Sequence, residues 1–349
     1  MIPYPTINFE LPAHLACPLP TEQRHIQRDE VRLLVSNGSG DLFHDHFSQL
    51  DHYLKPGDVL VVNTSATLPA AIPIHLADDS PAMLHLSTQF SETSWLVEIR
   101  AIKDTQTIRW KGGKAGMRVD LPGGGHIELV SPFYNNKQWI HLWKAEFHLD
   151  RPITSYLDIH GHPIKYTQLD NPFPLSYYQT YFSEHPGSSE MPSAGRGFTS
   201  SLVRKLLRKG LRFAPILLHT GISSLEQGEL PYPEYMEISA LSANIIQEAK
   251  STGNRIIAVG TTAIRALETA SHVQGEIQAF RGMTEVYIHE SYHMKIADGL
   301  LTGFHEPQAS HLNMLLSIAG MQHIDQAYRA AIQAQYFWHQ FGDLHLILS

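Results

Sequence analysis

The stretch Gly253 to Ala270, GNRIIAVGTTAIRALETA, has the pattern of a strand, a turn and a helix. Arg255 to Val259 is apolar and β-branched, which is typical of a buried strand. Gly260 ends that strand, and Thr262 is the expected N-cap of the helix that follows. Such a turn directs backbone N–H groups at one point, with Arg265 one helical turn away. It predicts a site for a carboxylate or phosphate, or an ordinary βα unit whose threonines only cap the helix.

A second stretch, Gly299 to Gly320, repeats this arrangement near the C-terminus as GLLTGFHEPQASHLNMLLSIAG. Leu300 to Phe304 is expected to end a strand, and a polar turn follows at His305. Ser310 is the expected cap of an apolar helix over 312–318. Parallel α/β folds bind ligands at the carboxyl ends of their strands, so we expect both turns to border one site.

The composition is that of an ordinary globular protein. The chain has 349 residues, enough for two domains, and 43% of them are hydrophobic. Its net charge of −8 does not indicate a general affinity for nucleic acids or anionic membranes, although a local basic groove remains compatible with it. A single cysteine, Cys17, excludes an internal disulfide. We find no signal peptide or membrane span in the sequence, and a cytoplasmic location is expected.

The middle of the chain differs from the rest. From residue 58 to 148 short alternating runs are separated by turn residues, which predicts an all-β barrel or sandwich without long helices. Residues 1–57 and 149–349 alternate strands with helices, which predicts a barrel-like or largely parallel α/β domain. The β domain is then an insertion into the α/β domain.

Several finer expectations concern the second half of the chain. A long functional loop is expected over 170–198. Helices are expected to be capped by Thr199 and Ser239, and a strand is expected over 285–289. The last helix is expected to run from Ile324 to Tyr336, before a final strand at 344–348. Asp41 to Leu54 is expected to be a short helical or turn segment.

Three motifs give the chain a family resemblance. They are AVGTTAIRALE (258–268), TGFHEPQASHLNMLL (302–316) and AYRAAIQAQYFWHQFGDLHLI (327–347). Their order and spacing are similar to those of S-adenosylmethionine:tRNA ribosyltransferase-isomerases of queuosine biosynthesis. The segments PGDVLVVN and YQTYF also resemble that family, so the resemblance covers nearly the whole chain.

The resemblance implies a fold and a reaction. The family has an α/β barrel-like domain with an inserted β-barrel domain. It moves the ribosyl part of S-adenosylmethionine onto a 7-aminomethyl-7-deazaguanine base in tRNA and isomerises the sugar. Adenine and methionine leave, and S-adenosylmethionine is a substrate rather than a bound cofactor. No metal is expected.

The chain departs from the family pattern mainly at basic positions. Ala66 and Ala71 stand where the family has arginines, and Gly197 replaces a histidine. Gln308 replaces a lysine, and Glu306 adds an acidic group. A further histidine and a glutamate are missing from the MEIS segment at 236–239. These losses weaken the expected contact with tRNA phosphates. Two alternatives therefore stay open: a paralogue that uses S-adenosylmethionine with a small acceptor or cleaves it, and a non-catalytic binding protein.

The candidate site residues follow from the motifs and the resemblance together. Loss of adenine is helped by a nearby acid, for which the candidates are His305, Glu306 and Asp343. The alternative for Asp343 is that it shapes a turn, and a lone histidine is often structural. The aromatic run at Tyr336 on the last helix is a candidate partner for the sulfonium, or part of the core. The residues expected to bind S-adenosylmethionine are Gly260, Thr261, Thr262, Arg265, Thr302, Phe304 and Tyr336. The sequence does not indicate an oligomeric state.

Overall fold

The computed structural model describes residues 7–103, 106–133, 141–165, 173–222, 232–271, 275–284, 286–307 and 309–348. Within these residues the largest sheet has nine strands, in the order β16-β14-β13-β3-β15-β17-β18-β1-β2. Its strands are β1 Arg32–Ser36, β2 Leu42–His46, β3 Val59–Asn63, β13 Arg212–Leu218, β14 Glu234–Ile238, β15 Ile256–Val259, β16 Phe280–Thr284, β17 Gly299–Gly303 and β18 Leu344–Leu348. The chain is therefore a mixed α/β protein.

Strand β3 shows how this sheet is buried on both faces. Val59 and Val61 pack into the core on one face, while Leu60 and Val62 pack into the core on the other. Such a strand is a continuous apolar run, because each face is covered. The adjacent strands β13, β3, β15 and β17 are parallel. The outer pairings are mixed, since β14 pairs antiparallel with β13 and β16, β17 with β18, and β1 with β2. The expectation of a largely parallel sheet therefore holds for its centre and for the pair of β18 and β1.

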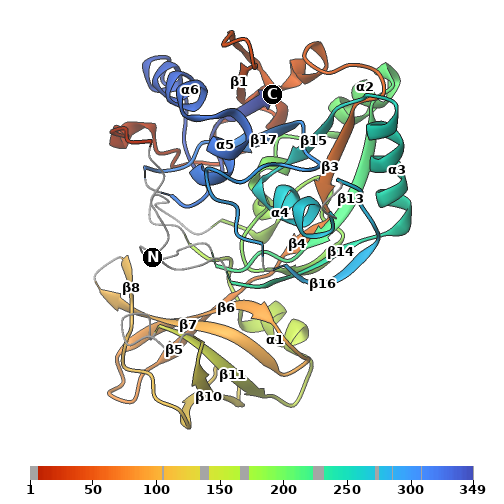
Figure 1. The fold of residues 1–349 in the computed structure, drawn as a ribbon. Coiled ribbons are helices and arrows are strands. Elements are labelled where there is room, and N and C mark those ends of the chain that lie inside the picture. The colour runs from red at the N-terminus through yellow and green to blue at the C-terminus, as the bar shows by residue number, and fades with distance from the viewer. Residues whose placement is uncertain are drawn as a thin grey trace.

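Helices cover both faces of the large sheet (Figure 1). The described α-helices are α1 Ile153–His160, α2 Ser200–Lys209, α3 Ala240–Ser251, α4 Thr261–Thr269, α5 Leu312–Ala319 and α6 Met321–Gln333. Helices α3 to α6 contribute to one core, and α2 contributes to the other. None of these helices combines the length and the apolar character needed to cross a bilayer.

The helix caps at Thr199 and Ser239 are confirmed. Thr199 Oγ1 accepts from the backbone N–H of Leu202, and Ser239 Oγ accepts from that of Ser242. Helix α2 ends at Gly210, which has a φ of 92° in the left-handed region that glycine adopts without strain.

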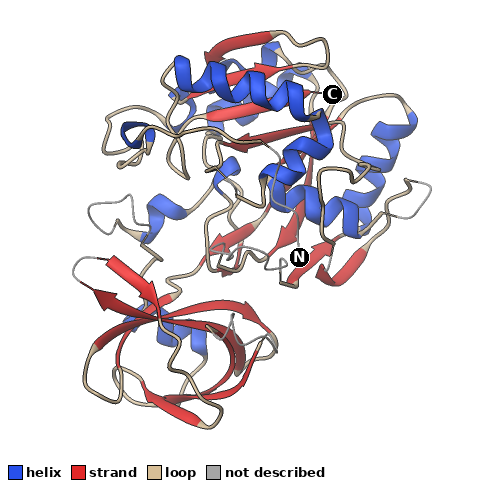
Figure 2. Ribbon diagram, turned by 60° about the vertical axis from the view of Figure 1, so that its left-hand side comes forward, coloured by secondary structure: helices blue, strands red, loops and turns tan. Residues whose placement is uncertain are grey.

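The second sheet is antiparallel and contiguous in sequence. Its strands are β5 Ala71–His75, β6 Pro81–Gln89, β7 Ser94–Lys103, β8 Gln106–Arg109, β9 Met117–Asp120, β10 His126–Pro132 and β11 Leu142–His148. Figure 2 shows these strands curving around a separate interior below the large sheet. That interior is a hydrophobic core of its own, to which α1 also contributes Tyr156 and Leu157. Every described element between residues 59 and 148 is a strand, as the alternating pattern predicts.

Three local expectations are wrong. The strand expected over 285–289 lies earlier, at β16, and the described residues 286–289 form no strand. The last helix ends at Gln333 rather than at Tyr336, because Gln335 adopts a φ of 57° that no α-helix contains. The segment 41–54 begins with β2 before a 3₁₀ helix at Phe47–His52.

The segment expected to be a long loop is ordered where it is described. It contains 3₁₀ helices at Leu175–Tyr178 and Ser193–Gly195, and strand β12 at His185–Ser188. Strand β12 pairs in parallel with β4, Ser65–Thr67. Residues 170–172 of that segment lie outside the described part.

Candidate functional site

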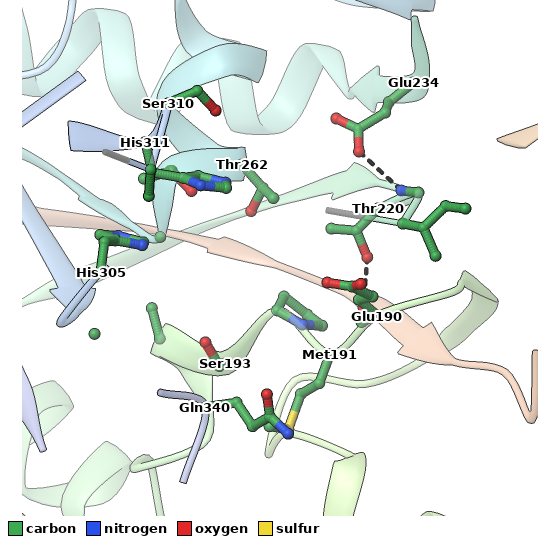
Figure 3. A pocket seen from close by; sticks show the side chains of 18 of the residues that line it. Glu190, Met191, Ser193, Thr220, Glu234, Thr262, His305, Ser310, His311 and Gln340 are labelled. Carbon is green, nitrogen blue, oxygen red and sulfur yellow. Dashed lines mark hydrogen bonds between the residues drawn. The ribbon is translucent and has the colours of Figure 1, made fainter. Parts of the chain in front are cut away.

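A cavity of about 470 Å³ lies at the carboxyl ends of β15 and β17. This volume is in the range of small-molecule sites. The two predicted turns border it together, and residues from β6 and β7 line it as well. Figure 3 shows His305, His311 and Thr262 on one side of the cavity and Thr220, Glu190 and Glu234 on another. The large sheet and the second sheet therefore both contribute to this site.

The turn after β15 is built around Gly260. Its φ of 92° and ψ of 154° make it the N-cap of α4, so the expected cap by Thr262 is wrong. The N–H of Gly260 donates to Leu301, and that of Ala263 donates back to Gly260. Of the expected cluster of free N–H groups, those of Thr261 and Thr262 remain without a hydrogen-bond acceptor among the described residues. The Thr262 hydroxyl is buried and has no hydrogen-bond partner in the described residues, so it is available to a ligand.

Arg265 lines the cavity, but its charge is already paired. Its guanidinium forms an ion pair with Glu234, and the side chain of each residue is 10% exposed. Glu234 Oε1 also accepts from the backbone N–H of Gly221 at 2.8 Å. Burial raises the pKa of Glu234, and Arg265 acts against that rise. Since the guanidinium compensates a buried carboxylate, it brings little net charge to the cavity.

His305 begins the turn after β17 and lines the same cavity. Its Nε2 lies 3.0 Å from Thr302 Oγ1, and its ring stacks on that of His311 with centroids 4.9 Å apart. Burial lowers the pKa of His305 well below its usual value, and the neighbouring His311 lowers it further. Burial also lowers the pKa of His311 to about 4. Both imidazoles are therefore neutral at pH 7.

His311 is a site residue that the sequence reasoning missed. It is the N-cap of α5, so the cap expected at Ser310 is also wrong. The signal was its position in the same motif as His305. A separation of six residues within a turn does not show, however, whether the two histidine rings lie close together. That depends on the fold of the turn.

Glu306 and His339 form a pair at the rim of the cavity. Glu306 Oε1 lies 3.5 Å from His339 Nε2, and the Glu306 side chain is 62% exposed. Burial lowers the pKa of His339, and Glu306 acts to raise it. Phe304 lines the cavity as well, with its ring 4.6 Å from that of Trp338.

Asp343 and Tyr336 lie outside the lining of this cavity. The two Asp343 oxygens accept from the backbone N–H groups of Arg32 and Phe337, both at 2.8 Å. The face of the Tyr336 ring is covered by the Arg32 guanidinium, 3.9 Å from the ring centroid. The structure therefore brings eight of the ten candidate residues to one cavity and places these two behind it.

The second sheet adds a polar wall that the sequence reasoning did not identify. Glu98 on β7 is buried and pairs with Arg100 and Arg109, at 3.0 and 3.2 Å. His85 lies directly opposite Glu98 on β6, and burial lowers its pKa to about 3. The alternation of apolar and polar residues places His85 and Glu98 on one face of their strands. It does not show that this face borders a ligand site.

Within the described residues, no group of three or more His, Cys, Asp or Glu side chains converges to hold a metal ion. The glutamine at 308, which replaces a lysine of the family, lies outside the described residues. Residues 223–229, which follow the end of β13 and Gly221, also lie outside the described residues.

The fold and the cavity define a class: a mixed α/β protein with a cavity of small-molecule size at its strand ends and an all-β sheet as one wall. Comparison with known proteins narrows the class. The family model described as "Queuosine biosynthesis protein" matches residues 5–347, and the chain belongs to this family.

Individual relatives agree with this assignment. The chain is 33% identical to the S-adenosylmethionine:tRNA ribosyltransferase-isomerase of Moorella thermoacetica and 31% identical to that of Desulforamulus reducens. Each alignment covers 98% of both proteins. The crystal structure of the S-adenosylmethionine tRNA ribosyltransferase of Thermotoga maritima superposes with a TM-score of 0.54 at 25% identity. That match covers 98% of this chain and 99% of the other.

Proposed function

We propose that this protein is an S-adenosylmethionine:tRNA ribosyltransferase-isomerase of queuosine biosynthesis. The observation that carries the proposal is the alignment of 98% of the chain with 98% of a relative of that name at 33% identity. As the resemblance implies, the ribosyl group of S-adenosylmethionine moves to a 7-deazaguanine base in tRNA, and adenine and methionine are released.

In this proposal the turn at Gly260 binds the methionine carboxylate. The free N–H groups of Thr261 and Thr262 and the Thr262 hydroxyl are donors at the positive end of α4. Arg265 contributes mainly through its Nε, which is buried and without a partner in the described residues. The carboxylate is then held by hydrogen bonds more than by a net charge.

His305 is the proposed acid–base residue. Thr302 engages its Nε2, which leaves the Nδ1 edge of a neutral ring for the substrate. The sulfonium acidifies the protons on the 5′ carbon, and a neutral imidazole can accept one of them. The resulting imidazolium has a low pKa, so it is a strong acid toward the departing adenine. Glu306 lies beside it at the rim, where its charge can stabilise cationic substrate groups.

Phe304 and Thr302 are proposed to form the wall behind the substrate. Both are buried and both line the cavity. Asp343 and Tyr336 are proposed to act from behind this wall: Asp343 by holding a turn, and Tyr336 by packing under Arg32.

We further propose that the strands from β5 to β11 form an inserted β-barrel domain and that the rest of the chain forms the α/β domain. The boundary expected at residue 58 moves to the start of β5, because β3 lies in the large sheet between β13 and β15, and β4 pairs with β12. The edge strands β5 and β9 approach each other, which supports closure of the second sheet. Glu98 and Arg100 of this domain line the cavity, which supports a role for the domain in contacting the acceptor base. A tRNA substrate implies a cytoplasmic location.

The experiment is incubation of the protein with S-adenosylmethionine, alone and with tRNA that carries 7-aminomethyl-7-deazaguanine. Adenine and methionine are measured by chromatography, and the modified nucleoside by mass spectrometry after digestion. Release that depends on the modified tRNA, with tRNA lacking the base as control, is the expected result. Release without any tRNA would instead indicate an enzyme that cleaves S-adenosylmethionine or uses a small acceptor. No binding and no release would leave a non-catalytic protein.

A further inference from the structure

The side-chain amide of Gln340 is the least explained polar group in the cavity. Gln340 lines the cavity, and its Nε2 is buried without a hydrogen-bond partner in the described residues. Buried amide donors are nearly always paired, and each exception calls for an explanation such as an absent ligand. Figure 3 shows the Gln340 amide on the same side of the cavity as Met191 and Ser193, across from His311 and Thr262.

The turn that carries Gln340 is rigidly held. Asp343 Oδ2 accepts from the N–H of Phe337, and the N–H of Asp343 donates to the Phe337 carbonyl. The N–H of Gly342 donates to His339, whose φ of 71° lies in the left-handed region that residues other than glycine seldom adopt. Strain of this kind persists only where the surrounding structure fixes it, and it gathers at ligand sites. The backbone from which the Gln340 side chain extends is therefore fixed.

We propose that Gln340 binds the adenine of S-adenosylmethionine through its side-chain amide, and so determines the specificity for the purine. A carboxamide offers one donor and one acceptor side by side. Adenine offers the complement, because its 6-amino group lies next to a ring nitrogen that accepts. This inference rests on the proposed function, since it assumes that the cavity binds S-adenosylmethionine.

The rest of the cavity supports this orientation. The opposite wall supplies the N–H groups of Thr261 and Thr262, which suit a carboxylate rather than a base. The wall near Gln340 supplies the thioether of Met191, a surface on which the face of a base can pack. A hydrogen bond from the amide to the ring nitrogen also stabilises the negative charge that develops on adenine as it departs.

The test uses calorimetric titration with two stable probes, S-adenosylhomocysteine and S-inosylhomocysteine. The second probe has an oxygen in place of the 6-amino group. It therefore lacks the N–H that donates a hydrogen bond to the carbonyl of the Gln340 amide. The wild type should bind the adenosyl probe about 10-fold more tightly than the inosyl probe. Gln340→Ala and the nearly isosteric Gln340→Met should bind the adenosyl probe about 10-fold more weakly and lose most of the discrimination.

Gln333→Ala is the matched control. This exposed glutamine ends α6 and does not line the cavity, so its variant should behave as the wild type. Unchanged affinity and discrimination in both Gln340 variants would overturn the assignment of Gln340 while leaving the proposed function intact. Failure of the wild type to bind either probe would overturn the proposed function, and the assignment with it.

Discussion

The ion pair between Glu234 and Arg265 makes a testable prediction about both stability and ligand binding. Each side chain is only 10% exposed, so removal of one partner leaves an uncompensated charge in a buried position. Breaking such a pair typically costs about 3–5 kcal/mol, whereas replacing both partners with neutral groups is often nearly neutral. We expect Arg265→Met alone and Glu234→Gln alone each to lower the free energy of unfolding by about 3–5 kcal/mol.

The double variant Glu234→Gln/Arg265→Met separates the two effects. Glutamine retains the oxygen that accepts from the Gly221 N–H, so only the charges are removed. We expect the double variant to be more stable than either single variant, as measured by urea unfolding followed by tryptophan fluorescence. If its loss instead equals the sum of the two single losses, the charges are not coupled and the pairing argument fails.

The same variants test the role of Arg265 in binding. In Glu234→Gln the guanidinium is no longer neutralised, so the affinity for the carboxylate of S-adenosylhomocysteine should rise by about 1.5 kcal/mol, roughly 10-fold. Calorimetric titration measures this change in variants that remain folded. Weaker binding in Glu234→Gln would show that the ion pair acts on the ligand as a unit, contrary to this reasoning.

Three further outcomes are expected. Thr262→Val should leave the free energy of unfolding within about 0.5 kcal/mol of the wild-type value, because Gly260 rather than Thr262 caps α4. It should weaken S-adenosylhomocysteine binding about 2- to 12-fold in calorimetry. The pKa of His311 is about 4 in the folded protein, below the value near 6.5 of an unfolded chain. The unfolded state therefore takes up the proton first, so stability is full above pH 6.5 and falls by roughly 3 kcal/mol toward pH 4. His311→Phe should flatten this part of the stability–pH curve in urea titrations. Gly342→Ala should cost about 1–3 kcal/mol in the same assay, because its Cβ would lie 2.4 Å from a backbone oxygen of the turn.

Local patterns in the sequence predicted much of this structure. The apolar run before Gly260 is the buried strand β15, and the alternating runs from β5 to β11 are antiparallel strands. The first run of residues 58–148, β3, is instead a parallel strand of the large sheet. Both kinds of strand are recognised by which of their residues are buried, and the spacing of apolar residues in the sequence reflects that burial directly. The two turns that border the cavity were predicted together, because strand ends of a parallel sheet meet at one edge.

The errors arose where distant contacts decide the outcome. The partner of Arg265 is Glu234, 31 residues earlier, and their pairing follows from the packing of α4 over β14 rather than from any spacing. Tyr336 fits the apolar spacing of α6 because its ring is buried, but it lies beyond the end of the helix at Gln333. Spacing alone does not distinguish these two cases. Gln340 was not a candidate because an unsatisfied amide can be recognised only when its neighbours are known.

The position of β18 has a consequence for synthesis of the protein. Leu344–Leu348 lies between β17 and β1 in the large sheet, so β1 has no parallel neighbour until this last segment has been synthesised. The strands of the second sheet, by contrast, lie within residues 71–148 and can pair as soon as they leave the ribosome. We therefore expect the large sheet to be completed last. Strands β1 and β2 should remain without their parallel partner strand during most of translation. Ribosome-bound chains that stop before residue 344 should show a protease-resistant core near residues 71–148 and a protease-sensitive N-terminal segment.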